Sequence, residues 1–258
     1  MRLWRRDRRT APRLPERDLQ VIWSVLSALL DYPDEALAAR VPVLRAALAP
    51  AAAGGELSGA VGAGVTGPIG QYLDLLESTD LGDLQRDYVA TFDVTRKHAL
   101  HLTYAVHGDT RRRGVALVEF KQAYRAAGAH FADGDELPDH LCVALQFGAL
   151  YSVPVAWKLL NDHRVSIELL AAALHRGESR FTPVVDALRA TLPALDGDGE
   201  QALRRLVAEG PPSEDVGLDN SPYGWDPRLA PSADPRLNPR PDPAPAGLGA
   251  TIPVGAPR

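Results

Sequence analysis

Apolar residues recur every three or four positions from about residue 18 to residue 209, the spacing that places them on one face of an α-helix. No segment in this range alternates strictly between apolar and polar residues, as a half-buried β-strand would. We therefore predict an all-α protein. The predicted helices cover residues 18–30, 34–48, 69–77, 84–92, 96–107, 110–131, 138–151, 155–175, 180–192 and 199–209.

Two of these helices have the most clearly defined apolar surfaces. On the helix predicted at 110–131, the apolar side chains step by three and four positions. They are Leu117, Phe120, Tyr124, Ala127 and Phe131. Pro138 suits the first turn of the next helix, which is apolar on almost every side from Leu141 to Tyr151. This helix is predicted to be central and buried.

The two ends of the chain differ in composition from its centre. Residues 1–17 carry a charge of +5 and the whole chain carries −5, so the remaining residues carry −10. From residue 210 onward, 12 of the 22 prolines fall within 49 residues and few large apolar side chains accompany them. Such a composition is typical of disorder. We predict a basic arm at 1–17, one helical domain at 18–209 and a Pro-rich tail at 210–258.

Charge and cysteine content exclude several classes of function. The acidic body lacks the clustered basic surface that nucleic acid requires. The single cysteine, Cys142, rules out an intrachain disulfide and is typical of a reducing compartment. The apolar segment 19–30 is shorter than the ~20 residues that cross a bilayer, and acidic Glu16 and Asp18 argue against a signal peptide. We therefore expect a cytoplasmic protein with no nucleic-acid partner and no stable membrane insertion.

Two motifs suggest ligand chemistry, and each has a simpler structural explanation. The segment Gly62–Gly67 fits the G-x-G-x-x-G dinucleotide fingerprint, but no predicted strand precedes it, so we interpret it as a flexible linker. His98 and His101 are three positions apart and share a predicted helix, near Asp93 or Asp109, as in a His/carboxylate metal site. No further ligand motif completes that set, and hydrogen-bonded histidines are the simpler interpretation.

Three arginines, Arg111, Arg112 and Arg113, occupy the first turn of the helix predicted at 110–131. The helix macrodipole favours anions there, so either an anionic ligand or acidic neighbours must compensate these charges. The serine and histidine residues form no nucleophile-elbow motif, and Cys142 lies within an apolar helix where a thiolate is disfavoured. We expect no catalytic activity.

The segment Glu136-Leu-Pro-Asp-His140 places two carboxylates around a predicted helix start, which suits capping. The charged form of His140 would oppose the helix dipole. This histidine is therefore either neutral and hydrogen-bonded or placed to meet a ligand.

Five segments in this order resemble the NarJ-type nitrate reductase assembly chaperones, within the wider TorD/DmsD-like family of redox-enzyme maturation chaperones. They are LLDYPDE at 29–35, YVATFD at 88–93 with Arg96, GDTR at 108–111 with Arg113 and Gly114, ELPDHL at 136–141, and ESRF at 178–181. Together they lie within about residues 20–195. Three positions depart from the family pattern: Cys142 where proline is common, Gln146 where an acidic residue is common, and His101 in place of an aromatic or aliphatic residue.

The resemblance implies a TorD-like helical bundle and a system-specific chaperone that is not an enzyme. It implies binding of the N-terminal segment of the apo nitrate reductase α subunit, which is kept from docking at the membrane until the molybdenum cofactor is inserted. The cofactor is then cargo of the partner enzyme and is not bound permanently, and proteins of molybdenum cofactor biosynthesis are further expected partners. The alternatives are a carrier that grips molybdopterin phosphate through Arg111, Arg112 and Arg113, or, more remotely, a His-based metal enzyme.

A groove between the helices predicted at 110–131 and 138–151 is the expected site for an amphipathic peptide. Its apolar contributors are Leu117, Phe120, Tyr124, Leu141 and Leu145, and its rim consists of Glu136, Leu137, Pro138, Asp139 and His140. Because each apolar residue suits a protein core equally well, Asp139 and His140 are the stronger candidates.

Overall fold

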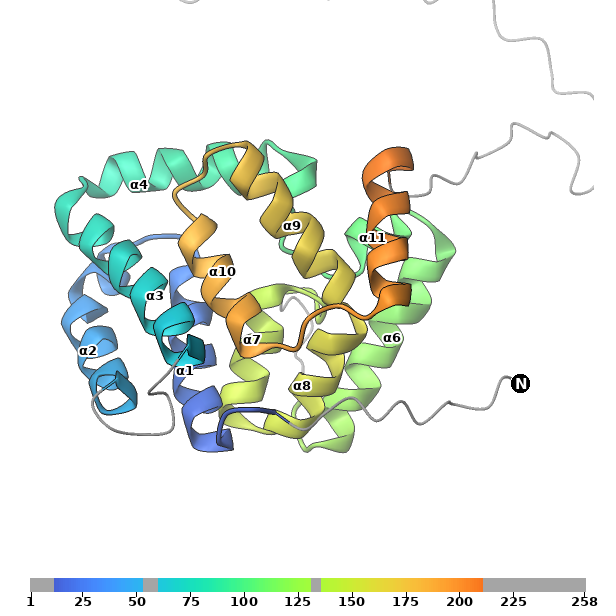
Figure 1. Ribbon diagram of the computed structural model, residues 1–258, viewed down its shortest axis with the longest axis horizontal. Coiled ribbons are helices and arrows are strands. Elements are labelled where there is room, and N and C mark those ends of the chain that lie inside the picture. The colour runs from blue at the N-terminus through green and yellow to red at the C-terminus, as the bar shows by residue number, and fades with distance from the viewer. Residues whose placement is uncertain (1–11, 53–59, 131–135, 211–258) are drawn as a thin grey trace, which may run out of the picture. The chain divides into compact units, whose positions relative to one another are not determined.

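The computed structural model describes residues 12–52, 60–130 and 136–210. Within these ranges the chain forms eleven α-helices and no β-strand, which confirms the predicted all-α class (Figure 1). The helices are α1 (Glu16–Leu29), α2 (Glu35–Ala52), α3 (Ala60–Ser78), α4 (Leu81–Tyr88), α5 (Tyr104–His107), α6 (Arg111–Ala126), α7 (Leu141–Leu150), α8 (Val153–Asp162), α9 (Arg164–Arg176), α10 (Thr182–Thr191) and α11 (Gly197–Glu209). A π-helical turn at Val89–Asp93 continues α4, and a 3₁₀ turn follows at Arg96–His98.

The first helix, α1, lies in the core and packs against α2, α7, α8 and α10. Trp23 on this helix is fully buried; its ring stacks on Trp157 of α8 with centroids 6.4 Å apart. The indole N–H of Trp23 donates a hydrogen bond of 3.3 Å to Thr191 Oγ1 at the end of α10. Because a buried indole needs such a partner, this side chain joins three helices through both its apolar and its polar atoms.

α7 approaches α1 closely at Gly148. A Cβ atom at this position would lie 2.5 Å from Cε3 of Trp23 and 2.7 Å from Cβ of Ala156. Only glycine fits there, so α7 supports the core as well as the segment that precedes it. The prediction that this helix is buried is confirmed for most of its side chains.

The segment Gly62–Gly67 is part of α3, so its interpretation as a flexible linker was wrong. α3 packs on α10, and the two run side by side in Figure 1. A Cβ atom at Gly64 would lie 3.4 Å from Cβ of Ala190, which is an ordinary van der Waals contact. Within the described ranges no strand precedes this segment, and the structural context of a dinucleotide site is therefore missing there.

Two other predicted helices differ from those observed. The helix expected at 155–175 is divided at His163 into α8 and α9, and Pro154 lies in the first turn of α8. The helix expected at 96–107 is reduced to a 3₁₀ turn and the four-residue α5. Between these two pieces His101 forms an isolated bridge, and Leu102 and Thr103 form a turn.

The predicted Pro-rich tail lies outside the described residues except for Gly210, and so does most of the predicted basic arm. Along the described stretches, no helix combines the length and the apolar character needed to cross a membrane.

Candidate functional site

The segment 136–140 is held by backbone pairing with a second segment that precedes α5. Leu102 N donates to Asp139 O at 3.0 Å, and Leu141 N donates to Leu100 O at 2.8 Å. Pro138 and Asp139 form a turn, closed by a hydrogen bond of 2.9 Å from His140 N to Leu137 O, and His140 forms an isolated antiparallel bridge with His101, so α7 begins only at Leu141. The expectation that Pro138 occupies the first helical turn was wrong for this reason.

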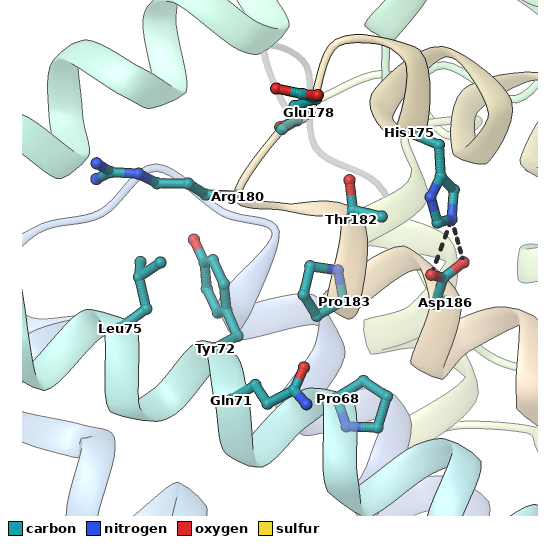
Figure 2. Close-up of a pocket in the computed structure, with 11 residues that line it drawn as sticks. Pro68, Gln71, Tyr72, Leu75, His175, Glu178, Arg180, Thr182, Pro183 and Asp186 are labelled. Atoms are coloured by element: carbon teal, nitrogen blue, oxygen red, sulfur yellow. Dashed lines mark hydrogen bonds and ion pairs between the residues drawn. The ribbon is translucent and has the colours of Figure 1, made fainter.

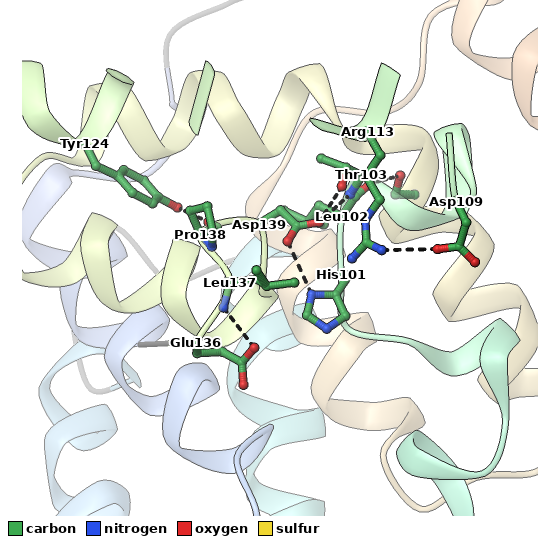
Figure 3. Close-up of polar contacts among 11 residues, drawn as sticks. His101, Leu102, Thr103, Asp109, Arg113, Tyr124, Glu136, Leu137, Pro138 and Asp139 are labelled. Atoms are coloured by element: carbon green, nitrogen blue, oxygen red, sulfur yellow. Dashed lines mark hydrogen bonds and ion pairs between the residues drawn. The ribbon is translucent and has the colours of Figure 1, made fainter. Parts of the chain in front are cut away.

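Asp139 is completely buried and is not an accessible rim residue, contrary to expectation. Its Oδ2 accepts hydrogen bonds from the backbone N–H of Thr103, at 3.1 Å, and from the Thr103 hydroxyl (Figure 3). Its Oδ1 lies 3.3 Å from Nδ1 of His101. Although burial raises the pKa of Asp139, the hydrogen bonds from His101 and Thr103 outweigh it, and the pKa lies below its ordinary value. The carboxylate therefore joins the two segments in its charged form.

Two helices hold this pair of segments in place. The hydroxyl of Tyr124 on α6 donates to Pro138 O at 2.9 Å (Figure 3). The hydroxyl of Ser166 on α9 donates to Leu102 O at 2.6 Å. Sequence reasoning missed Thr103 and Ser166, because their partners are distant in the chain and leave no local pattern.

His140 is half-buried, and its ring meets that of His101 edge to face, with centroids 5.2 Å apart. Burial lowers the pKa of His140 and the charge of His101 lowers it further, against the opposing charges of Glu136, Asp139 and Asp31. The imidazole is therefore neutral at pH 7 and places no positive charge at the start of α7, where the helix dipole would oppose one.

Around this fixed core the surface is apolar and acidic. Leu137 is 39% exposed, and Tyr32 is 46% exposed with its ring edge against Tyr88. Glu136 and Asp31 are exposed, and the charges of both act on His140. We call these four residues, Asp31, Tyr32, Glu136 and Leu137, the acidic-apolar surface.

The apolar groove expected between the helices at 110–131 and 138–151 is filled by the protein's own side chains. Phe120, Tyr124, Leu141 and Leu145 are all completely buried, and Leu117 is half-buried. The Tyr124 ring packs on Phe147 of α7 with centroids 4.2 Å apart, and Phe120 packs on His163. These rings pack against one another and against His163 in the core, so a peptide reaches them only if α6 and α7 separate.

The three arginines at the start of α6 have different surroundings. Arg111 and Arg112 are exposed, whereas the Arg113 guanidinium lies 5.3 Å from the ring centroid of Tyr104. Arg113 Nη1 is 3.5 Å from Asp109 Oδ1 (Figure 3). This arginine therefore has both an aromatic and an acidic neighbour. Contact of these arginines with an anion remains a prediction.

The two histidines considered for a metal site have separate hydrogen-bond partners. His98 Nδ1 lies 3.0 Å from Thr91 O, and His101 pairs with Asp139. Within the part of the chain that the structure describes, no group of three or more His, Cys, Asp or Glu residues is arranged to hold a metal ion. Cys142 is buried, and burial raises the pKa of its thiol, as expected for a structural cysteine.

Comparisons with known proteins point to one group. The family described as nitrate reductase delta subunit matches residues 58–185. The chain is 28% identical over 175 residues to the probable nitrate reductase molybdenum cofactor assembly chaperone NarJ of Bacillus subtilis, covering 68% of this chain and 90% of that protein. It is 33% identical over 181 residues to the nitrate reductase molybdenum cofactor assembly chaperone NarJ of Escherichia coli K12, covering 67% and 71%. It is also 32% identical over 168 residues to the nitrate reductase-like protein NarX of Mycobacterium tuberculosis H37Rv, covering 65% of this chain but 24% of NarX.

Proposed function

This chain belongs to the family of nitrate reductase molybdenum cofactor assembly chaperones, and we propose that it acts by binding the N-terminal segment of the apo nitrate reductase α subunit. In this proposal the bound segment is withheld from membrane docking while the molybdenum cofactor is inserted. The chain acts as a chaperone, as its relatives are named, and not as an enzyme.

The observation that supports this proposal best is the acidic-apolar surface on a rigid base. Leu137 is exposed although the residues beside it are fixed by Asp139, Tyr124 and Ser166. A recognition surface is most effective when its contacts need no ordering upon binding, because the entropic cost of association then falls. The segment 136–140 meets this condition.

The chemistry of this surface favours one type of peptide. Leu137 and Tyr32 offer apolar area, and Glu136 and Asp31 offer negative charge. An amphipathic segment with basic residues beside its apolar positions is complementary to both features. In this proposal the half-buried His140, on which the charges of Glu136 and Asp31 both act, orients the approaching backbone or side chains.

Titration calorimetry with the N-terminal peptide of the α subunit tests this proposal. Changing Leu137 and His140 together to Ala is expected to weaken binding at least about tenfold, or about 1.4 kcal/mol. Val207→Ala is the matched control, since Val207 is an exposed residue on α11. Asp139 is left unchanged because its substitution disturbs the fold. Equal affinity of the double variant and the control variant would contradict the site.

The fate of the cofactor forms a separate part of the proposal. We propose that the molybdenum cofactor is cargo of the enzyme and does not reside on this chain, and that proteins of cofactor biosynthesis meet the complex transiently. The competing carrier function relies on Arg111, Arg112 and Arg113, of which the first two are exposed. Pterin fluorescence of the purified protein separates the two functions: stoichiometric pterin that is lost on changing the three arginines to Ala would favour the carrier.

A further inference from the structure

The helix α6 has a second surface, on the side that faces away from the core. Its buried side, with Phe120 and Tyr124, packs into the protein. On the outward side, exposed residues follow one another in steps of three and four positions, the spacing of one helix face. They are Arg111, Gly114, Val115, Val118, Lys121 and Arg125, and we call them the basic-apolar face.

This face concentrates positive charge on an otherwise acidic chain. α6 contains five cations and one carboxylate, a net charge of +4, whereas residues 18–258 as a whole carry −10. Arg111 lies at the start of the helix, where the dipole opposes positive charge. Lys121 and Arg125 are like charges four positions apart, which repel each other. The charge pattern is therefore unfavourable for the helix by itself.

The cations of this face differ from ionic side chains that are paired within the protein. In the cavity of about 430 Å³ between α3 and α10, His175 Nε2 lies 2.9 Å from Asp186 Oδ2 (Figure 2). Asp186 also binds Arg189 Nη1 at 2.8 Å. By contrast, Lys121 and Arg125 have no ion-pair partner within the described ranges of the chain. Their charges are available to another molecule.

The apolar part of the face contributes little to the fold. Val115 is 62% exposed and Val118 is 52% exposed. A Cβ atom at Gly114 would meet nothing within 4 Å, so no contact inside the protein requires glycine there. Valine and glycine are also weaker helix formers than alanine. Beside one another on the surface, they offer apolar area and room for the close approach of a second helix.

We propose that the basic-apolar face binds an acidic amphipathic helix of a partner protein. Carboxylates of such a helix pair with Arg111, Lys121 and Arg125 and compensate the dipole at the start of α6. Its apolar residues pack on Val115 and Val118, and its backbone approaches α6 over the open glycine.

An anionic membrane surface is less complementary to this face than an acidic helix is. The large apolar side chains that would insert into lipid, Phe120 and Tyr124, are buried in the core. The negative charge of the chain as a whole opposes its approach to anionic lipid. Tyr124, which holds the segment 136–140, lies on a different side of α6 from the two valines. The face is therefore separate from the peptide-binding proposal, and either one stands if the other fails.

Photo-cross-linking of the full chain in its host cell tests this proposal. Gln122 lies on the same face, between Val118 and Arg125, and is replaced by p-benzoylphenylalanine. Mass spectrometry is expected to identify a cross-linked partner segment with net negative charge and with apolar residues three and four positions apart. Gly114→Ala is expected to lower the yield at least about fivefold, because its Cβ fills the space that the partner backbone takes. The double charge reversal Lys121→Glu with Arg125→Glu is expected to lower it at least about tenfold.

Two controls separate loss of binding from loss of fold. Arg204→Glu with Arg205→Glu makes the same charge change at exposed positions on α11 and is expected to leave the yield unchanged. Gly114→Ala favours the helix, so urea unfolding is expected to show this variant at least as stable as the wild type. Absence of cross-links, or cross-links to lipid, to a second copy of this chain or to segments without acidic residues, would overturn the proposal. Equal yields from the wild type, the Gly114 variant and the variant reversed at Lys121 and Arg125 would overturn it as well.

Discussion

Replacement of Asp139 by Asn tests whether the buried carboxylate holds the 100–103 and 136–140 segments together. Asp139 accepts two hydrogen bonds from Thr103 and is paired with His101, and none of its surface is exposed. A hydrogen bond to a charged group contributes about 1.5–3 kcal/mol, and one between neutral groups about 0.5–1.5 kcal/mol. Over three such contacts, D139N should lose about 2–4 kcal/mol of unfolding free energy.

Urea unfolding at several pH values measures this loss. Because the pKa of Asp139 is lowered in the folded state, its contribution is present above the ordinary carboxyl pKa of about 3.9 and is lost as the pH falls through the folded-state pKa. The gap between wild type and D139N should therefore narrow as the pH is lowered below about 4. Glu136→Gln, an exposed neighbour, should change stability by no more than about 0.5 kcal/mol. A D139N protein as stable as E136Q at neutral pH would refute the reasoning.

Three further outcomes are expected. Gly148→Ala should lower the free energy of unfolding in urea by about 1–3 kcal/mol, because the new Cβ would clash with Trp23. Gly114→Ala, whose Cβ would meet nothing within 4 Å, should raise it by about 0.5–1 kcal/mol. Similar effects of the two substitutions would contradict the packing at α7. Cys142 should react with a thiol reagent only after denaturant is added, since burial raises the pKa of its thiol, and rapid labelling of the native protein would count against this. His163 has a lowered pKa, so its contribution to stability is present above the ordinary value of about 6.5 and is lost on acidification. His163→Gln should then show a smaller loss of stability between pH 7.5 and 5 than the wild type, and an unchanged loss would disprove this.

The helices that could be predicted from the sequence are those whose apolar residues recur at helical spacing. The apolar spacing on the first helix, from Leu19 to Leu30, predicts its buried face because residues three or four positions apart lie on the same face of a helix. The same reasoning placed Phe120 and Tyr124 on one face of α6. It did not show whether that face meets a partner or the core, because apolar spacing is the same in both cases.

The errors have tertiary causes. Glycine disfavours helices, so the segment at 62–67 was read as a linker, yet α3 forms there because it packs on α10 and buries Val65 and Ile69. The non-helical backbone at His101 pairs with His140, and the His101 side chain contacts Asp139, 38 positions away. No local sequence pattern shows this pairing, so the segment 136–140 was interpreted as the capped start of a helix.

Deletion of this gene in its host, with re-expression of the chain, tests the central claim most directly. The quantity to measure is molybdenum bound per nitrate reductase α subunit. Family membership predicts that the deletion leaves α subunit that is largely free of molybdenum and that the wild-type chain restores it, whereas the Leu137/His140 double alanine variant, at equal expression, restores it poorly. Full molybdenum content in the deletion strain would contradict the assignment as an assembly chaperone.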